Sequence, residues 1–388
     1  MTWNTKCAYS FLLLLVTLSS RPCVGLDLVK DGKPVATIVV PDQPLPVVRL
    51  AAQELNYHLK RATGAALPIV SESKAPQTGA LVILGTCQAT ADAGIATTEL
   101  DPNTWILKLR DNHFFLAGDD SDGAAAWILH GNRTRVGTLF AVYQFLEKHL
   151  QVKWLWPGEL GEIIPKTANV IVDQWDEVGS PPLVHTRWRD GGNMIAGTAG
   201  WSSPGARSRF LSEQGKWLRR HRFAMGRNMD MAHAFTTWWK RHGETHPEYF
   251  NLLPDGSRRS DPTYHGGSPK LISMSVGHPA FQEAVVQHWL QTRRPDKPWI
   301  DCSENDTSGR CLCPFCLALD EPDPTLAFPW DERLQRAREA YAASDGKWVA
   351  NLGSLSDRYA RYYKGVLALA RKHDPDAVVM GYAYANYV

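Results

Sequence analysis

The second half of the chain repeats one pattern, a short apolar run followed by an amphipathic helical stretch, and this repetition restricts the fold more than any other feature. The runs that we predict to be strands lie at 183–190, 223–235, 270–275, 298–302 and 377–387. Helical patterns lie between them at 207–222, 278–294 and 356–373. Successive strand–helix units place their strands parallel in one sheet, and such a series without a reversal predicts a (β/α)8 TIM-barrel-like domain.

The length of this region is short for a whole barrel. A (β/α)8 barrel takes roughly 250 residues, whereas the region with this pattern covers only residues 180–388. We therefore expect a partial barrel, truncated after about five strands. A half barrel would expose an open sheet edge, so we also expect the natural reading frame to be longer or this chain to be a fragment.

The preceding segment, residues 26–175, predicts a small α/β domain. A helix is expected from Pro46 to Gly64, because its apolar residues repeat at helical spacing on one face, and a second helix is expected at 137–150. Short apolar strands are expected at 36–40, 66–70, 80–85, 105–110 and 113–118. The last two should form a hairpin across Asp111 and Asn112. A linker is expected near 168–182.

The N-terminus, residues 1–25, has the pattern of an export signal. Lys6 precedes the apolar stretch from Phe11 to Leu18, and small residues permit cleavage before Leu26. The stretch is too short to cross a bilayer, and no later segment is long and apolar enough to do so. We therefore expect an exported protein, periplasmic or extracellular. Net charge is only +2, which gives no reason to expect a nucleic-acid partner.

In a barrel of this kind the active site lies at the carboxyl ends of the strands. That rule selects two acids after the fourth predicted strand, Glu304 and Asp306, as catalytic candidates. It also selects a set of candidate substrate-binding residues after the first, second, fourth and fifth strands: Arg187, Trp188, His233, Asn305, Tyr382 and Tyr384.

Glu304 and Asp306 suit glycoside hydrolysis, which needs two carboxyl groups across the scissile bond. In an extended segment residues i and i+2 project to one side, roughly 6–7 Å apart. The alternative is that neighbouring acids in a loop are simply solvated, and catalytic pairs normally come from different strands. A lone histidine such as His233 more often has a structural role than a functional one, and Arg187 is either a clamp for the substrate or part of a salt bridge.

Four cysteines, Cys302, Cys311, Cys313 and Cys316, lie close together around the same acids. Four thiolates suit a structural zinc, but the spacing C-x8-C-x-C-x2-C differs from two separated C-x2-C pairs. A redox C-x2-C pair is a further reading. Export favours oxidation, so we favour disulfides that pin the loop, with zinc as the alternative. No other cofactor is expected.

Two segments support a family resemblance. "HPEYFNLLPDGSR" (246–258) followed by "SENDTSGRCLCPFC" (303–316) resembles the DUF4838 family of exported glycoside-hydrolase-like proteins. "VRLAAQELNYHLKRATGAALPIV" (48–70) and "GTLFAVYQFLEKHLQVKWLWPGELGEIIP" (137–165) resemble the non-catalytic domain that precedes the barrel in α-glucuronidases and β-hexosaminidases. The resemblance implies a carbohydrate-active barrel in which Glu304, or alternatively Asp306, is the general acid and the base comes from later strands.

Three hypotheses follow from these patterns. The first is a glycoside hydrolase acting on a polysaccharide or oligosaccharide by carboxylate acid/base catalysis. The second is a non-catalytic carbohydrate-binding protein, or an inactive fragment, on the same scaffold. The third is a metal-stabilised interaction module. The 15 tryptophans fit the first two through stacking on sugar rings, and fit all three as core packing.

Overall fold

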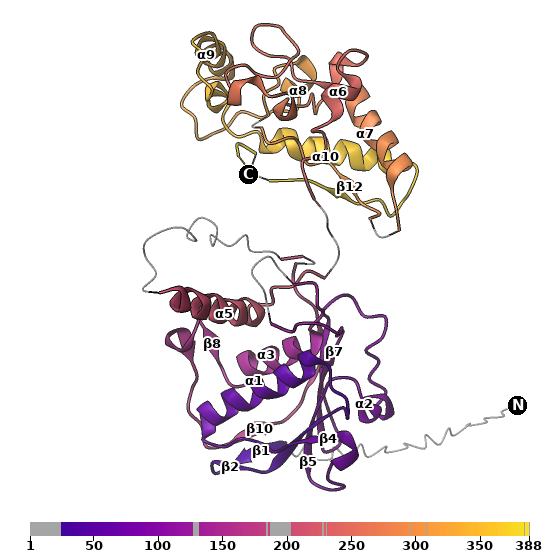
Figure 1. The fold of residues 1–388 in the computed structure, drawn as a ribbon, viewed down its shortest axis with the longest axis vertical. Helices are drawn as coiled ribbons and strands as arrows, with labels where there is room; N and C mark the ends of the chain where they lie inside the picture. Colours follow the sequence, from indigo (N-terminus) through magenta and orange to yellow (C-terminus); the bar gives the residue numbers. More distant parts are fainter. Residues whose placement is uncertain are drawn as a thin grey trace, which may run out of the picture. The chain divides into compact units, whose positions relative to one another are not determined.

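Residues 25–126, 132–183, 185–186, 203–226, 229, 231–295, 297–307, 309–383 and 385–387 are described by the computed structural model. The chain divides into two units, Met1–Arg227 and Asn228–Val388. Figure 1 shows the first unit in indigo to magenta and the second in orange to yellow. Each unit is described by itself.

A six-stranded sheet forms the centre of the first unit. Its order is β11 (Asp176–Gly179), β6 (Trp105–Arg110), β7 (His113–Gly118), β5 (Ala80–Leu84), β3 (Ala36–Val40) and β4 (Ile69–Ser71). The ladders from β7 to β4 are parallel, whereas β6 pairs antiparallel with both β7 and β11. The predicted hairpin is confirmed, and Asp111 makes its turn with a positive φ of 52°.

Two helices, α1 (Pro46–Thr63) and α3 (Gly137–Lys148), pack side by side in the first unit (Figure 1). Pro46 stands in the first turn of α1, and Gly64 ends the helix with a φ of 85°, a conformation that glycine adopts without a Cβ penalty. The apolar stripe of α1 is buried with that of α3 and with one set of alternate strand residues. The other set, which includes Ile83 and Phe115, forms a separate small core near α2 (Gln88–Asp92).

Smaller elements complete the first unit. A three-stranded sheet has the order β10 (Val170–Val172), β1 (Leu26–Lys30) and β2 (Lys33–Pro34), and β8 (Lys153–Trp154) pairs with β9 (Glu162–Ile163). Two 3-10 turns are η1 (Glu72–Lys74) and η2 (Glu159–Gly161).

Helix α5 (Pro204–Arg220) also belongs to the first unit. The sequence pattern grouped this helix with the later strands, but its buried contacts are with the first unit. Arg220 donates to Glu54 at 3.0 Å and to Glu162 at 2.7 Å, and all three side chains are at least nine-tenths buried. The indole N–H of Trp217 donates to the Trp154 carbonyl at 2.9 Å. These bonds hold the helix against elements that precede it in the chain.

The described residues of the second unit are mainly helical and include one short parallel ladder. Strand β12 (Ile300–Asp301) pairs with β13 (Val379–Met380). The helices are α6 (Trp238–His242), α7 (Pro279–Thr292), α8 (Pro314–Leu317), α9 (Trp330–Ala342) and α10 (Ser356–Ala370). The 3-10 turns are η3 (Pro247–Tyr249), η4 (His265–Gly267), η5 (Pro269–Leu271) and η6 (Trp348–Leu352). Helices α7 and α10 pack together over a common core.

A closed or five-stranded barrel is not found in the described residues. Of the five predicted strands, 298–302 and 377–387 contain β12 and β13, and most of 183–190 lies outside the described part of the chain. The described residues of 223–235 form no strand and make one isolated bridge, Met225 with His185. The run 270–275 is not a ladder strand; it makes one antiparallel bridge, Phe250–Met274. Its backbone hydrogen bonds are made with residues 249 and 251, and its serine side chains bind buried polar groups. The backbone of this run therefore does not pair with a parallel strand.

The predicted export signal, apart from Gly25, lies outside the described residues. Within the described part of the chain, none of the helices combines the length and apolar character that a bilayer crossing requires.

Candidate functional site

The candidate site lies at the carboxyl edge of the β12–β13 ladder. The two strands are parallel, with Asp301 opposite Met380, and the N–H of Cys302 donates to the Met380 carbonyl at 2.7 Å. The segments that follow the two strands therefore begin at the same edge of the ladder. These segments carry residues 302–307 after β12 and Tyr382 after β13.

Glu304 lies at the base of this edge with an exposed fraction of 0%. Its Oε1 accepts hydrogen bonds from the Ser273 hydroxyl at 2.5 Å and from the Met274 N–H at 2.6 Å, and its Oε2 accepts one from the Tyr359 hydroxyl. Burial raises the pKa of the Glu304 carboxyl to about 7, although the bonds from Ser273 and Met274 act against that rise. This carboxyl therefore joins three segments inside the protein.

His233 contacts both the Glu304 backbone and the Tyr382 ring. The His233 Nδ1 lies 2.6 Å from the Glu304 carbonyl oxygen. Because a carbonyl only accepts, Nδ1 must carry the proton, and the neutral ring has its lone pair on Nε2. The Tyr382 ring packs edge-on against the imidazole at 5.4 Å between centroids, and the Tyr363 hydroxyl fixes the Tyr382 carbonyl at 2.8 Å. Both His233 and Tyr382 are half-buried.

The two predicted catalytic acids do not share a face. Glu304 is buried, whereas Asp306 is exposed. The N–H of Thr307 donates back to the Asn305 carbonyl at 2.5 Å, and this tight turn replaces the extended segment on which the prediction depended. Asn305 is buried and donates to the Ile272 carbonyl at 2.8 Å, while its Oδ1 has no hydrogen-bond partner among the described residues. Asn305 is thus held inside the fold.

Three other predicted site residues, Arg187, Trp188 and Tyr384, lie outside the described residues. The sequence analysis missed Ser273 and Tyr359, the donors to Glu304. Ser273 and Ser275 alternate with apolar residues in the "ISMS" run, and buried serines at such positions are a signal for a polar partner inside the core. Tyr359 gave no such signal, because it fits the apolar face of its helix.

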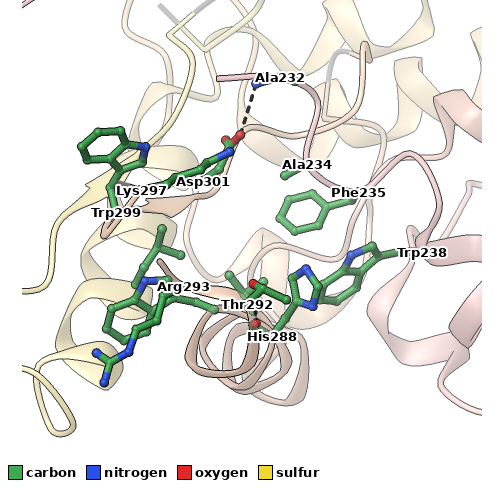
Figure 2. Close-up of a pocket in the computed structure, with 13 residues that line it drawn as sticks. Ala232, Ala234, Phe235, Trp238, His288, Thr292, Arg293, Lys297, Trp299 and Asp301 are labelled. Atoms are coloured by element: carbon green, nitrogen blue, oxygen red, sulfur yellow. Dashed lines mark hydrogen bonds between the residues drawn. The ribbon is translucent and has the colours of Figure 1, made fainter. Parts of the chain in front are cut away.

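A pocket of about 260 Å³ lies beside the same edge. Figure 2 shows Trp299 on one side of it, Phe235 and Trp238 on the other, and α7 residues below. The carboxylate of Asp301 accepts the Ala232 N–H at 3.1 Å, which links the pocket wall to the segment that carries His233 (Figure 2). The pocket is near the small end of the range for ligand sites and combines aromatic walls with a few polar groups.

Of the four cysteines predicted to lie close together, three form a group and Cys302 lies apart from it. All four are free thiols. The Sγ atoms of Cys311, Cys313 and Cys316 lie within 4.8 Å of one another. Cys302 is buried outside this group, and burial raises the pKa of its thiol. Burial also raises the pKa of Cys311, whereas hydrogen bonds from the neighbouring thiols lower that of Cys313. The structure thus contains neither the favoured disulfide nor a four-cysteine cluster among its described residues.

The family model described as "Domain of unknown function (DUF4838)" matches residues 156–388. The chain belongs to the DUF4838 family. The predicted recognition is therefore confirmed. The match includes all of the second unit, so the β12–β13 edge, its acids and the three grouped cysteines lie inside the DUF4838 region.

Among solved structures, the chain is similar to a family GH115 4-O-methyl-α-glucuronidase with specificity for decorated arabinogalactans. The identity is 18% and the TM-score 0.33, over 51% of this chain and 25% of that one. The matched part thus spans about a quarter of the length of the glucuronidase. The curated proteins include no match to this DUF4838 chain.

Proposed function

We propose that this chain is a glycoside-hydrolase-like protein, exported from the cell, that acts on a polysaccharide or oligosaccharide. The observation that carries the proposal is the arrangement at the β12–β13 edge. An exposed carboxyl, Asp306, follows two residues after Glu304, whose carbonyl oxygen is contacted by His233, and the Tyr382 ring packs against the His233 imidazole. Carboxyl, imidazole and phenol groups on one edge are the groups that glycoside hydrolysis uses for proton transfer and substrate contact.

Within this proposal the two acids take different roles. Asp306 is the proton donor to the leaving glycosidic oxygen, because it is the acid that a glycan can reach. Glu304 is a positioning residue, since both of its oxygens are bound by Ser273, Met274 and Tyr359. Asp306 accounts for protonation of the leaving group, and hydrolysis also needs a second carboxyl across the scissile bond.

The aromatic pocket beside the edge is the proposed contact for a sugar ring. Trp299, which is half-buried, lines it from one side (Figure 2), and an aromatic face suits the apolar C–H face of a pyranose. Lys297 and Asp301 supply polar partners for hydroxyl groups. The size of the pocket suits one sugar residue rather than a long chain.

The experiment is a substrate screen on the purified full-length chain. Aryl glycosides, including α-glucuronides and N-acetyl-β-hexosaminides, and soluble polysaccharides would be tested for released chromophore or reducing ends. Asp306→Asn should lower turnover by about 10²–10⁴-fold, the usual contribution of a general acid. Asp376→Asn, which removes another exposed carboxyl of the second unit, is the matched control. Equal turnover in Asp306→Asn and Asp376→Asn would refute the assignment.

A second candidate function is carbohydrate binding without hydrolysis. It is favoured by the burial of Glu304, the acid that the resemblance implies to be catalytic, behind donors of the protein itself. This alternative predicts retention of the chain by a glycan in affinity electrophoresis, with no release of reducing ends from that same glycan. Trp299→Ala should then weaken the retention, whereas Asp306→Asn should leave it within a few-fold.

A further inference from the structure

Three buried sulfur atoms of the second unit converge on one point. Cys311, Cys313 and Cys316 have exposed fractions of 1%, 0% and 0%, and their Sγ atoms lie within 4.8 Å of one another. A tetrahedral zinc with metal–sulfur bonds of about 2.3 Å places its sulfurs about 3.8 Å apart. Closing the group onto such an ion therefore requires movements of no more than about 1 Å.

The hydroxyl of Ser275 completes a four-cornered arrangement with these sulfurs. Its Oγ lies 3.0 Å from the Cys313 sulfur, 3.7 Å from that of Cys311 and 3.8 Å from that of Cys316. With zinc–sulfur and zinc–oxygen bonds of about 2.3 and 2.0 Å, a tetrahedral site separates oxygen from sulfur by about 3.5 Å. The three observed oxygen–sulfur distances lie on both sides of this value. The Ser275 hydroxyl therefore occupies the position of a fourth tetrahedral ligand.

Each of the three sulfurs also accepts a backbone N–H. Leu252 donates to Cys311 at 3.3 Å, Cys316 to Cys313 at 3.4 Å, and Gly277 to Cys316 at 3.3 Å. Such outer bonds orient metal ligands and stabilise the charge of a thiolate. A buried neutral thiol is a weak acceptor and does not need a dedicated donor, so three separate N–H groups are a feature of a site built for thiolates.

The chain around the sulfurs is rigidly fixed. Arg358, which is fully buried, donates to the Cys311 carbonyl at 3.0 Å and to the Gly309 carbonyl at 3.2 Å, while both Asp320 oxygens hold it at 2.6 Å. Gly277 is equally constrained, because a Cβ at this position would lie 2.3 Å from the Phe315 carbonyl oxygen. The three sulfurs thus lie on one segment that is held by Leu252, by Ser275 and Gly277, and by Arg358.

We propose that Cys311, Cys313 and Cys316 bind one Zn²⁺ ion as thiolates, with Ser275 at the fourth position. The ion fixes the loop behind the β12–β13 edge and has a structural role. Cys302 takes no part in the site. One disulfide among the three cysteines would leave an odd thiol and would remove two of the ligands.

The test measures metal content and coordination in the purified full-length chain. Plasma mass spectrometry after a brief chelator wash should give about one zinc per chain. Replacement by Co²⁺ should produce the near-ultraviolet thiolate charge-transfer band and the visible bands of a tetrahedral ion. Cys313→Ser and Cys316→Ser should abolish both signals. Cys87→Ser, which removes a free thiol of the first unit, should retain them.

Ser275→Ala tests the fourth corner separately. It should keep the charge-transfer band, shift the visible bands, and weaken zinc affinity by about 10–100-fold. Alkylation of the denatured wild-type chain should label all three cysteines once the metal is removed. The proposal is overturned by folded protein that holds no zinc and gives no cobalt band. It is also overturned if two of the three cysteines in the denatured chain are alkylated only after reduction, because those two would then form a disulfide. Both results come from wild type, so they stand even where a variant fails to fold.

Discussion

The buried Glu304 carboxyl predicts a specific dependence of the stability of the second unit on pH. Its pKa is about 7 in the folded protein and 4.5 as an ordinary glutamate. Between these values the folded state holds a proton that the unfolded state has released. Stability therefore falls as pH rises from 4.5 to 7, and it is constant with respect to this group outside that window.

The size of the effect follows from the difference between the two pKa values. At 1.36 kcal/mol per pKa unit, the difference corresponds to a loss of about 3 kcal/mol of unfolding free energy between pH 4.5 and 7. Glu304→Gln removes the titrating group while it keeps nearly the same shape. The difference in unfolding free energy between wild type and Glu304→Gln should therefore decrease by about 3 kcal/mol across this window.

Urea unfolding at a series of pH values measures this difference. Hydrogen exchange of peptides from α10 shows that the unfolding being measured is that of the second unit. Glu283→Gln on α7, which removes an exposed carboxyl, is the matched control and should give a flat difference profile. A flat profile for Glu304→Gln, or one that rises with pH, would refute the reasoning. A rise would mean that the bonds from Ser273, Met274 and Tyr359 outweigh burial and hold the carboxyl ionised.

Three further changes test packing and buried charge. Arg358→Met should cost about 3–5 kcal/mol in urea unfolding, because it leaves the Asp320 carboxylate, 3% exposed, without its partner; adding Asp320→Asn should recover part of this loss. Gly277→Ala should destabilise the second unit by about 1–3 kcal/mol, because the new Cβ would collide with the Phe315 backbone. The control Gly205→Ala in α5 should change stability by about 1 kcal/mol or less. Arg220→Met should lower the unfolding free energy of the first unit by about 3–5 kcal/mol, because two buried glutamates lose their ion pairs.

The first unit was largely predictable because its signals are local. The helix predicted from Pro46 to Gly64 is α1, and the strands predicted at 36–40, 105–110 and 113–118 have the same bounds in the structure. In these segments the apolar period, the turn residues and the helix ends all favour the same element. The sheet order depends on contacts between distant segments and did not follow from the sequence.

The second unit was less predictable because polar groups determine much of it. Helices α7 and α10 and both short strands were anticipated, but α9 was not. Its buried face consists of Arg333, Ala337 and Tyr341, and an arginine on that face hides the apolar pattern. Strands β12 and β13 lie within segments predicted to be strands, while the burial of Glu304 was not predicted. Its donors lie 30 to 55 residues away in the chain, and no spacing rule connects them.

The measurement that tests the central claim most directly compares glycan binding and turnover in wild type and Asp306→Asn on one substrate from the screen. The account predicts a fall in kcat of at least about 100-fold with KM within a few-fold of wild type, because Asp306 acts on the leaving oxygen and not on ground-state binding. An unchanged kcat in folded Asp306→Asn, with turnover present in wild type, would contradict the claim that this edge is the catalytic site.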